Sequence, residues 1–389
     1  MDDPARRGYL AARPPPSMRI FFDARELYFL TQFVPVQRVL RERGVETRFV
    51  AYHNRGALHE RIRRGFEREE LPTEWVESKE DGLALYQRER PDWVVFGRGS
   101  GLAQHLPEGT RTAQLYHGIG MKTDLWEPQL NGFDVRFIEG DYYAGRVREL
   151  FPDAPLVQVG YPKIDPLLWT DRERPTADLA RIGLDPEKPT VLYAPTHSPS
   201  SFPNMADDWP AHFPDYNLIV KPHQLSHHSS KRSSHRRKMA LWSEAPNVHV
   251  VPIESYDAVP YMNAADLMIS DVSAVLYEFA ATGKPVIQAD FLAYHWTKSG
   301  PLWYRRWQRV DRPILRRFHG LAAHAKRYRD LARLVPACLD APAAGSEERL
   351  ALTRELVGPL DGRSAERVAD VLAARGVAAS PRVSLSGCR

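Results

Sequence analysis

The stretch DLMISDVSAVLYEFAATGKPVIQAD, residues 266–290, decides how this chain folds. Two short, near-continuous apolar runs, at 266–271 and 285–290, end in polar residues. Between them lies a segment of helical composition that ends at Gly283. A strand, a helix and a second strand in this order form a βαβ unit. Apolar strands of this kind are covered on both faces, as in parallel sheets. The stretch therefore predicts a doubly wound α/β fold.

The same alternation extends in both directions along the chain. Apolar runs typical of buried strands lie in the first half at 18–24, 47–53, 92–98, 112–118, 135–140 and 156–162, and in the second half at 190–196, 216–223 and 247–253. Amphipathic segments separate them. The sequence therefore predicts two Rossmann-like domains that face each other across a cleft, with a hinge near 165–185 and a C-terminal helix at 364–376 that packs back on the first domain.

These patterns divide the chain into five parts. An Arg/Pro-rich arm, 1–17, is expected to be disordered. The first Rossmann-like domain spans 18–168 and the second 169–345; the helices that cross back occupy 346–376, and a tail follows at 377–389.

Composition excludes several classes of protein. The 389 residues contain 53 Lys and Arg, 49 Asp and Glu and only two Cys, with no Cys/His spacing typical of a zinc site. No apolar run is long enough to span a bilayer, and the first residues lack the apolar core of a secretory signal. We therefore expect a cytoplasmic protein. Peripheral contact of this protein with the inner face of the cell membrane is a second expectation.

One segment carries a strong local charge. Residues 301–329 contain nine Lys or Arg and one acid, with Trp303, Tyr304, Trp307 and Phe318 among them. Such a segment suits anionic lipid head groups or a phosphate-rich polymer; the alternative is a solvated helical surface. No motif of a nucleic-acid-binding domain is present, so nucleic acid is not an expected partner.

Polar residues gather where the predicted strands end, which is where doubly wound sheets bind ligands. His117 follows one strand of the first half, with Gly118 beside it and Lys122 further on. An imidazole there can take a proton from an attacking hydroxyl. The alternative is a structural loop histidine.

Three strand ends of the second half carry further candidates. Lys221 and His223 suit anionic oxygens such as those of a diphosphate, or form a plain strand-end turn. Ser270 or Asp271 is expected to cap the following helix, with Ser273 in its first turn, where backbone amides favour anions. Glu278 either reaches a ribose hydroxyl or is a surface glutamate, and Thr196 faces the same cleft or a solvated turn.

The order of these segments is more informative than any one of them. The series LYHGIGMK (115–122), VGYPKID (159–165), VLYAPTHS (191–198), LIVKPH (218–223), DLMISDVSAVLYEFAATGKPVI (266–287) and DGRSAERVADVL (361–372) resembles the CDP-glycerol glycerophosphotransferase family. These are teichoic acid primases and polymerases, and related capsule polymerases, of GT-B fold. The resemblance implies a first domain that binds the acceptor and a second that binds the nucleotide donor.

The resemblance also implies a reaction and roles. An acceptor hydroxyl of a lipid-linked or anionic polymer attacks the glycerol-bearing phosphate of CDP-glycerol, and CMP leaves. His117 would be the general base, with Gly118 and Lys122 on the acceptor side. On the donor side, His223 would be the second catalytic residue. The residues that bind the donor and its diphosphate would be Lys221, Ser270, Asp271, Ser273, Thr196 and Glu278. No metal or other cofactor is expected, because no DxD motif ends a strand.

Several motifs depart from the family pattern. Ile119-Gly120-Met121 replaces the usual Thr-Pro segment, Val272 and Ala274 stand where Tyr and Ser are usual, and Gln224 replaces Pro. A CDP-ribitol or another activated polyol therefore stays open as donor. The alternative reading is a GT-B glycosyltransferase or a UDP-sugar 2-epimerase-like enzyme that uses a nucleotide sugar.

Overall fold

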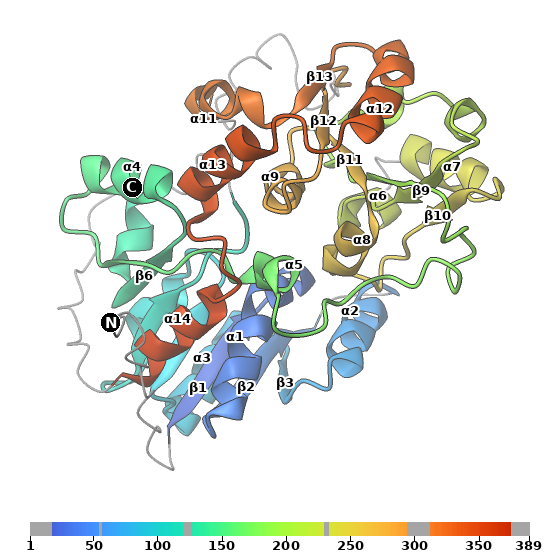
Figure 1. Ribbon diagram of the computed structural model, residues 1–389. Coiled ribbons are helices and arrows are strands. Elements are labelled where there is room, and N and C mark those ends of the chain that lie inside the picture. The colour runs from blue at the N-terminus through green and yellow to red at the C-terminus, as the bar shows by residue number, and fades with distance from the viewer. Residues whose placement is uncertain (1–17, 54–56, 120–125, 229–232, 294–311, 375–389) are drawn as a thin grey trace, which may run out of the picture.

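Two parallel sheets form two lobes of the molecule. The computed structural model describes residues 18–53, 57–119, 126–228, 233–293 and 312–374. In Figure 1 the blue-to-green lobe holds the first sheet and the yellow-to-orange lobe the second. Every pairing between neighbouring strands is parallel in both sheets. The predicted pair of Rossmann-like domains is confirmed.

The first sheet has seven strands in the order β3-β2-β1-β4-β5-β6-β7. They are β1 (Arg19–Ala24), β2 (Glu46–Tyr52), β3 (Thr73–Val76), β4 (Trp93–Phe96), β5 (Arg111–Gln114), β6 (Val135–Ile138) and β7 (Leu156–Gln158). The order reverses between β1 and β4, which is the topological switch point of a Rossmann-type sheet.

The second sheet has six strands in the order β10-β9-β8-β11-β12-β13. They are β8 (Thr190–Tyr193), β9 (Asn217–Val220), β10 (Val248–Val250), β11 (Leu267–Ser270), β12 (Val286–Ala289) and β13 (Ala323–Ala325). Its switch point lies between β8 and β11, so the polar residues after these strands meet at one edge.

Helices cover the faces and ends of both sheets. The α-helices are α1 (Leu30–Glu42), α2 (Ala57–Arg68), α3 (Lys79–Glu89), α4 (Asp141–Leu150), α5 (Asp165–Leu168), α6 (Gln224–His228), α7 (Ser233–Trp242), α8 (Val259–Ala264), α9 (Ala274–Ala280), α11 (Arg312–Arg317), α12 (Leu331–Asp340), α13 (Ser346–Val357) and α14 (Ser364–Ala373). Short 3-10 helices are η2 (Leu27–Phe29), η3 (Gly101–His105), η5 (Pro128–Gly132), η6 (Pro162–Ile164), η7 (Phe202–Asn204), η8 (Trp209–His212), η11 (His319–Leu321) and η12 (Tyr328–Asp330). None of the helices in the described ranges has the length and apolar composition needed to cross a bilayer.

Each strand predicted from an apolar run is present, but β3 and β13 were not predicted. Both are short strands at one edge of their sheet, and each has partly exposed residues. Edge strands need no continuous apolar run, because one side lacks a neighbour. The polar, basic and low-complexity composition of segment 226–238 predicts a loop, but the segment is helical where the structure describes it, in α6 and α7.

The first sheet ends at Gln158 and the second begins at Thr190. The proposed boundary at 168/169 therefore falls in the connection between the two sheets. All the domain boundaries stay predictions, and the arm 1–17 and the tail 377–389 lie outside the described residues.

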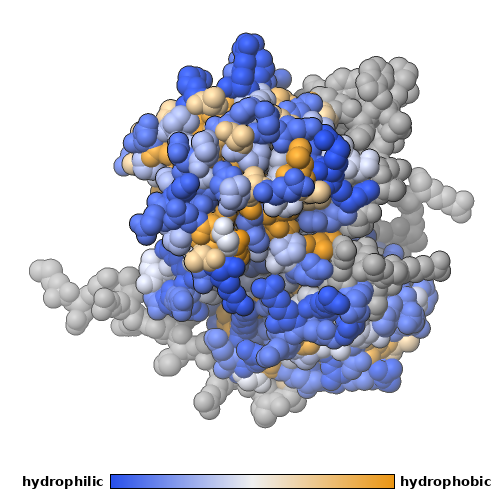
Figure 2. Space-filling view, turned by 90° about the vertical axis from the view of Figure 1, so that its right-hand side faces the viewer, coloured by the Kyte–Doolittle hydropathy of each residue, from blue (hydrophilic) through white to orange (hydrophobic). Residues whose placement is uncertain are grey.

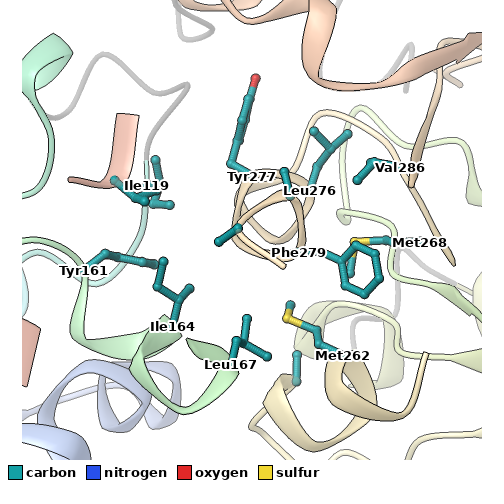
Figure 3. Packing of buried hydrophobic residues seen from close by; sticks show 14 of the residues in the cluster. Ile119, Tyr161, Ile164, Leu167, Met262, Met268, Leu276, Tyr277, Phe279 and Val286 are labelled. Carbon is teal, nitrogen blue, oxygen red and sulfur yellow. The ribbon is translucent and has the colours of Figure 1, made fainter. Parts of the chain in front are cut away.

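An apolar cluster of buried residues joins the two lobes. Ile119, Tyr161, Ile164 and Leu167 of the first lobe pack against a group from the second that includes Met262, Met268, Leu276 and Phe279. Figure 3 shows the two groups facing each other around α9. Figure 2 shows hydrophobic side chains at the middle of one side, between two largely hydrophilic parts. Burial of this shared surface stabilises the arrangement of the lobes.

The C-terminal helix packs back on the first lobe, as predicted. Ala365, Val368, Ala369 and Leu372 of α14 belong to the core cluster that includes much of α1 and β1, and Figure 1 shows α14 in red beside α1. The Asp165 carboxylate accepts hydrogen bonds from the backbone N–H groups of Ser364, at 3.1 Å, and Ala365, at 2.7 Å. The buried Asp165 carboxylate thus provides hydrogen-bond acceptors for two backbone N–H groups in the first turn of α14, which have no partner within the helix.

We predict that Asp165→Ala loosens α14. Loss of two capping hydrogen bonds should reduce stability by about 1–2 kcal/mol, and amide hydrogen exchange should accelerate across residues 364–373. The matched control is Asp171→Ala, which removes an exposed carboxylate paired with Arg172 and should leave exchange unchanged. Equal exchange in α14 of Asp165→Ala and wild type would contradict this account.

Candidate active site

His117 follows β5 and is fixed by the loop after β4. Its Nδ1 lies 2.8 Å from the carbonyl oxygen of Gly97. A carbonyl oxygen only accepts hydrogen bonds, so in the neutral ring the proton sits on Nδ1 and the lone pair on Nε2. This tautomer is the one in which Nε2 can accept a proton from a substrate hydroxyl.

Aromatic rings hold the His117 imidazole in place. The ring of Phe29 stacks on it with centroids 5.0 Å apart, and Tyr28 packs at 4.9 Å. Gly97 is needed in this arrangement, because a Cβ atom there would lie 2.6 Å from the Phe29 ring. The role of Gly97 was missed at the sequence level, since DWVVFGR reads simply as the end of a strand.

A cavity of about 610 Å³ opens beside His117. Arg98, Gln104, Glu127 and Gln129 supply polar groups to its wall, with aromatic surface from Tyr28, Tyr116 and Phe133. Gly118 has open space where a Cβ atom would lie, whereas the predicted acceptor-side Lys122 lies outside the described residues. The described residues that line this cavity all come from the first lobe.

In the second lobe, Asp271 organises the loop after β8. Its buried carboxylate accepts hydrogen bonds from the backbone N–H of Thr196, at 2.7 Å, and of Ser201, at 2.9 Å. The Ser201 hydroxyl donates to it at 3.0 Å and that of Ser200 at 3.3 Å. Burial raises the pKa of Asp271 to about 6, although these donors favour the ionised form. These contacts fix the backbone of Thr196 in the loop after β8; the predicted donor contacts of Thr196 and Asp271 stay predictions.

Ser270, the last residue of β11, and Ser273, which follows the strand, make different contacts. The Ser270 hydroxyl is buried and donates to the carbonyl of Ala194 at 2.7 Å. Helix α9 begins at Ala274 with Ser273 at its N-cap position and no side-chain capping bond. The prediction that Ser270 or Asp271 caps this helix is therefore wrong, because both side chains are turned to the β8 end of the sheet.

Lys221 and His223 follow β9, next to β8 in the sheet. The Nδ1 atom of His223 accepts a hydrogen bond from the backbone N–H of Leu225 at 3.1 Å, and its ring lies 4.4 Å from that of His197, centroid to centroid. Burial lowers the pKa of Lys221 to about 8; nearby Lys163 lowers it further, and Asp257 opposes the shift. The contact between His197 and His223 was not predicted.

Glu278 lies in α9 and is fully buried, so the alternative of a surface glutamate is wrong. Its carboxylate oxygens lie 2.9 and 2.8 Å from Lys163 Nζ, and the Tyr161 hydroxyl donates to Oε1 at 3.1 Å. Lys163 and Tyr161 belong to the first lobe, so this ionic contact joins the lobes. The predicted donor contact of Glu278 stays a prediction.

A chain of hydrogen bonds runs from this contact toward His117. The Lys163 backbone N–H donates to Gln32 Oε1 at 3.0 Å, and Gln32 Nε2 donates to the carbonyl of Tyr116 at 3.1 Å. Tyr116 directly precedes His117 in the chain. Sequence reasoning missed Gln32, because a glutamine in an amphipathic helix carries no signal of a tertiary contact.

The structure thus groups the predicted residues into two sets. Thr196, Lys221, His223, Asp271 and Ser270 lie at the carboxyl ends of the adjacent strands β8, β9 and β11, whereas His117 belongs to the other lobe. Among the described residues, no group of three or more His, Cys, Asp or Glu side chains could hold a metal ion. The expected absence of a cofactor stays a prediction.

Comparisons with solved structures identify similar folds. The chain is similar to the wall teichoic acid polymerase TagF in a structure determined with CDPG, with a TM-score of 0.58, 16% identity and coverage of 92% of this chain and 88% of that one. A putative UDP-N-acetylglucosamine 2-epimerase from Listeria monocytogenes has a TM-score of 0.60 and 15% identity, with coverage of 90% of this chain and 95% of that one. For S. aureus MnaA in complex with UDP, the TM-score is 0.56 and the identity 12%, with coverage of 90% of this chain and 95% of that one. These identities establish the GT-B fold alone. No curated protein matches the chain.

A family model adds the decisive result. The model of CDP-Glycerol:Poly(glycerophosphate) glycerophosphotransferase matches residues 142–374, which is more than half of the chain. The match includes all the second-lobe candidates and Lys163, and it leaves His117 outside. The chain therefore belongs to the CDP-glycerol:poly(glycerophosphate) glycerophosphotransferase family and is a glycerophosphotransferase enzyme of GT-B fold.

Proposed function

We propose that this enzyme transfers a glycerol-phosphate unit from CDP-glycerol to an acceptor hydroxyl during synthesis of a teichoic acid or capsule polymer, with release of CMP. The family match carries this proposal. The donor-side candidates at the ends of β8, β9 and β11 all fall within the match, and these three strands are neighbours in one sheet.

The first lobe supplies the base. The acceptor hydroxyl enters the cavity beside His117 and gives its proton to Nε2, whose lone pair is set by the Nδ1 contact with Gly97. The acceptor oxygen forms a bond to the glycerol-bearing phosphorus of the donor. A positioned base of this kind accelerates proton transfer by about 10²–10⁴-fold.

The second lobe stabilises the leaving group. The bond between the glycerol-bearing phosphorus and the bridging oxygen breaks, and its electron pair leaves with CMP. Lys221 and His223 hold the diphosphate and offset the charge that develops on it. Thr196 lines the donor pocket on the loop that Asp271 holds.

We predict that His117→Ala lowers CMP release from CDP-glycerol by about 10²–10⁴-fold, with donor affinity within about threefold of wild type. The released nucleotide is read by chromatography with an acceptor glycoside present: CMP from CDP-glycerol or CDP-ribitol, and UDP from UDP-N-acetylglucosamine. His105→Ala, at an exposed histidine of η3, is the control and should keep full activity. Wild-type turnover in His117→Ala would remove the assigned base, and turnover of the UDP-sugar alone would favour a sugar-nucleotide enzyme.

We predict that donor affinity falls as the pH rises through about 8. Because burial lowers the pKa of Lys221 to about 8, its ammonium is lost above that pH. The donor diphosphate carries no titrating group there, so log Kd for CDP-glycerol should rise with a slope approaching one per pH unit. Calorimetry from pH 7 to 9.5 measures this, and Lys221→Met should bind weakly at every pH. A flat profile in wild type would contradict a binding role for the Lys221 ammonium.

We further propose cytoplasmic action at an anionic membrane surface. The described part of the basic segment presents exposed cations, Arg316, Arg317, Lys326, Arg327 and Arg329. Phe318 is buried against Tyr142 and Tyr277, so it is not available for lipid contact, contrary to its expected place in the patch; residues 301–311 lie outside the described ranges.

We predict salt-sensitive binding to anionic vesicles. Sedimentation with vesicles containing about one-third phosphatidylglycerol should capture wild type at low salt and release it at 0.5 M salt, because screening weakens surface charge. Replacement of Arg316, Lys326, Arg327 and Arg329 by Gln should reduce capture several-fold, whereas replacement of the exposed Arg146 and Arg148 of α4 should not. Equal capture by neutral and anionic vesicles would argue against an electrostatic surface.

A further inference from the structure

A glycine-rich loop forms one wall of the cavity beside His117. The loop follows β4 and reads GRGSG over residues 97–101, and its residues 98–101 all line the cavity. It lies where the strand order of the first sheet reverses, between β1 and β4, which is the place where sheets of this type bind ligands. The loop contains no acid, so this wall offers hydrogen-bond donors without a carboxylate of its own.

Arg98 brings a positive charge to this wall. The residue is exposed, and its guanidinium makes no hydrogen bond or close ion pair with any residue in the described ranges. The half-buried Glu26 interacts with it electrostatically, but not at ion-pair distance. A guanidinium in this position can hold an anion with two parallel N–H groups, a geometry that suits a carboxylate or a phosphate.

The Ser100 hydroxyl is oriented to donate a hydrogen bond. Its oxygen accepts one hydrogen bond from the Arg25 guanidinium at 2.6 Å and another from the backbone N–H of Leu102 at 3.3 Å. A hydroxyl group has two acceptor lone pairs and one proton. Both lone pairs of Ser100 are used, and no residue that the structure describes accepts the proton. Because Ser100 lines the cavity, its proton can be donated to a ligand there.

A buried carboxylate supports the loop from below. Asp23 is 1% exposed and accepts hydrogen bonds from Arg25 Nε at 2.8 Å and from the hydroxyls of Tyr52, at 2.8 Å, and Tyr86, at 3.0 Å. Arg25 is thus compensated by Asp23 and does not line the cavity itself. The positive charge that the cavity receives from this side of the sheet is therefore that of Arg98.

The loop places these donors next to the proposed base. Gly97, whose carbonyl oxygen lies 2.8 Å from His117 Nδ1, directly precedes Arg98 in the chain. An anion bound by Arg98 would therefore lie close to the hydroxyl that gives its proton to His117. The anionic group and the attacking hydroxyl of the acceptor must then be near neighbours in its covalent structure.

The remaining polar groups of the cavity suit hydroxyl groups. Gln104, Glu127 and Gln129 line it, and the Glu127 carboxylate accepts a hydrogen bond from the Gln129 amide. A carboxylate repels an anion but accepts hydrogen bonds from hydroxyl groups, and amides accept and donate them. The cavity therefore suits a ligand that carries one anionic group, bound at the glycine-rich loop, together with several hydroxyl groups.

We propose that Arg98 selects the acceptor: together with Ser100 it binds a phosphodiester that is carried by the same polyol as the attacking hydroxyl. The inference rests on the proposed function, because it names the acceptor of that same site as the end of a polyol-phosphate chain. At such an end the terminal hydroxyl and the last phosphodiester enter the cavity together. In a lipid-linked saccharide the phosphate lies at the opposite end of the sugars from the attacking hydroxyl, so it would not reach Arg98.

The test compares glycerophosphoglycerol, in which one phosphodiester joins two glycerols, with its neutral methyl phosphotriester. Ligand-observed NMR titrations without donor give both affinities. Wild type should bind the diester about 10- to 100-fold more tightly than the triester, and Arg98→Met should lose about this factor for the diester. The affinities of Arg98→Met for the triester and for CDP should stay within about twofold of wild type, since neither ligand uses the Arg98 charge.

Two further variants show whether charge at this position is what matters. Arg98→Lys should lose less diester affinity than Arg98→Met, because it keeps the charge and loses the paired N–H groups. Arg41→Met, at an exposed arginine of α1 in the same lobe, should match wild type for every ligand.

Three results would overturn the inference. They are equal affinity of wild type for the diester and the triester, an equal loss for both in Arg98→Met, and a loss of CDP affinity in Arg98→Met as large as that for the diester. CMP release by wild type from CDP-glycerol tests the proposed function separately. Diester binding that depends on Arg98 without CMP release defeats the function and supports the anion site, whereas CMP release with unchanged diester binding in Arg98→Met supports the function and defeats the inference.

Discussion

The arrangement of the two lobes depends on one buried carboxylate. Glu278 is fully buried in α9 and is compensated by Lys163 and Tyr161 of the other lobe. A buried charge is costly without a partner and demands specific geometry from that partner. The apolar cluster around it supplies non-directional attraction. The ionic contact, by contrast, is satisfied in one relative position of the lobes, so we infer that it sets how the donor residues lie relative to His117.

Much of the fold could be predicted from the sequence because buried parallel strands are short, continuous apolar runs. The same topology rule placed Thr196, Lys221 and His223 at one edge, since the carboxyl ends of neighbouring strands meet there. What the sequence could not supply were contacts between distant residues. In the helix around Glu278, an acid among apolar residues has no visible partner, because Lys163 lies 115 positions away. Likewise nothing in DVSA indicates that Asp271 turns back to the loop after β8.

The two halves of the site rest on different kinds of evidence. The donor-side candidates lie inside the family match at 142–374 and at the carboxyl ends of neighbouring strands, and their donor-binding role is our proposal. His117 lies outside that match, and the similarity to TagF establishes the fold alone. Its assignment as base rests on local chemistry: a carbonyl fixes the tautomer, aromatic rings fix the plane, and a cavity adjoins the ring. A loop histidine without a catalytic role would not need a fixed tautomer, a fixed ring plane and an adjoining cavity at the same time.

The separation of these two sets has a chemical consequence for the proposed reaction. In phosphoryl transfer the attacking and leaving oxygens lie roughly in line on opposite sides of phosphorus. A base in one lobe and leaving-group cations in the other satisfy that requirement, because no single element has to reach both oxygens. As a consequence, the distance between His117 and the donor-side candidates depends on the interface between the lobes and not on either sheet alone. Lys163 lies at that interface, bound to Glu278 of the second lobe and through Gln32 to the carbonyl of Tyr116, which follows β5 and precedes His117. Lys163 therefore links helix α9 of the second lobe to the loop that carries His117, although nothing in its motif VGYPKID indicates either contact.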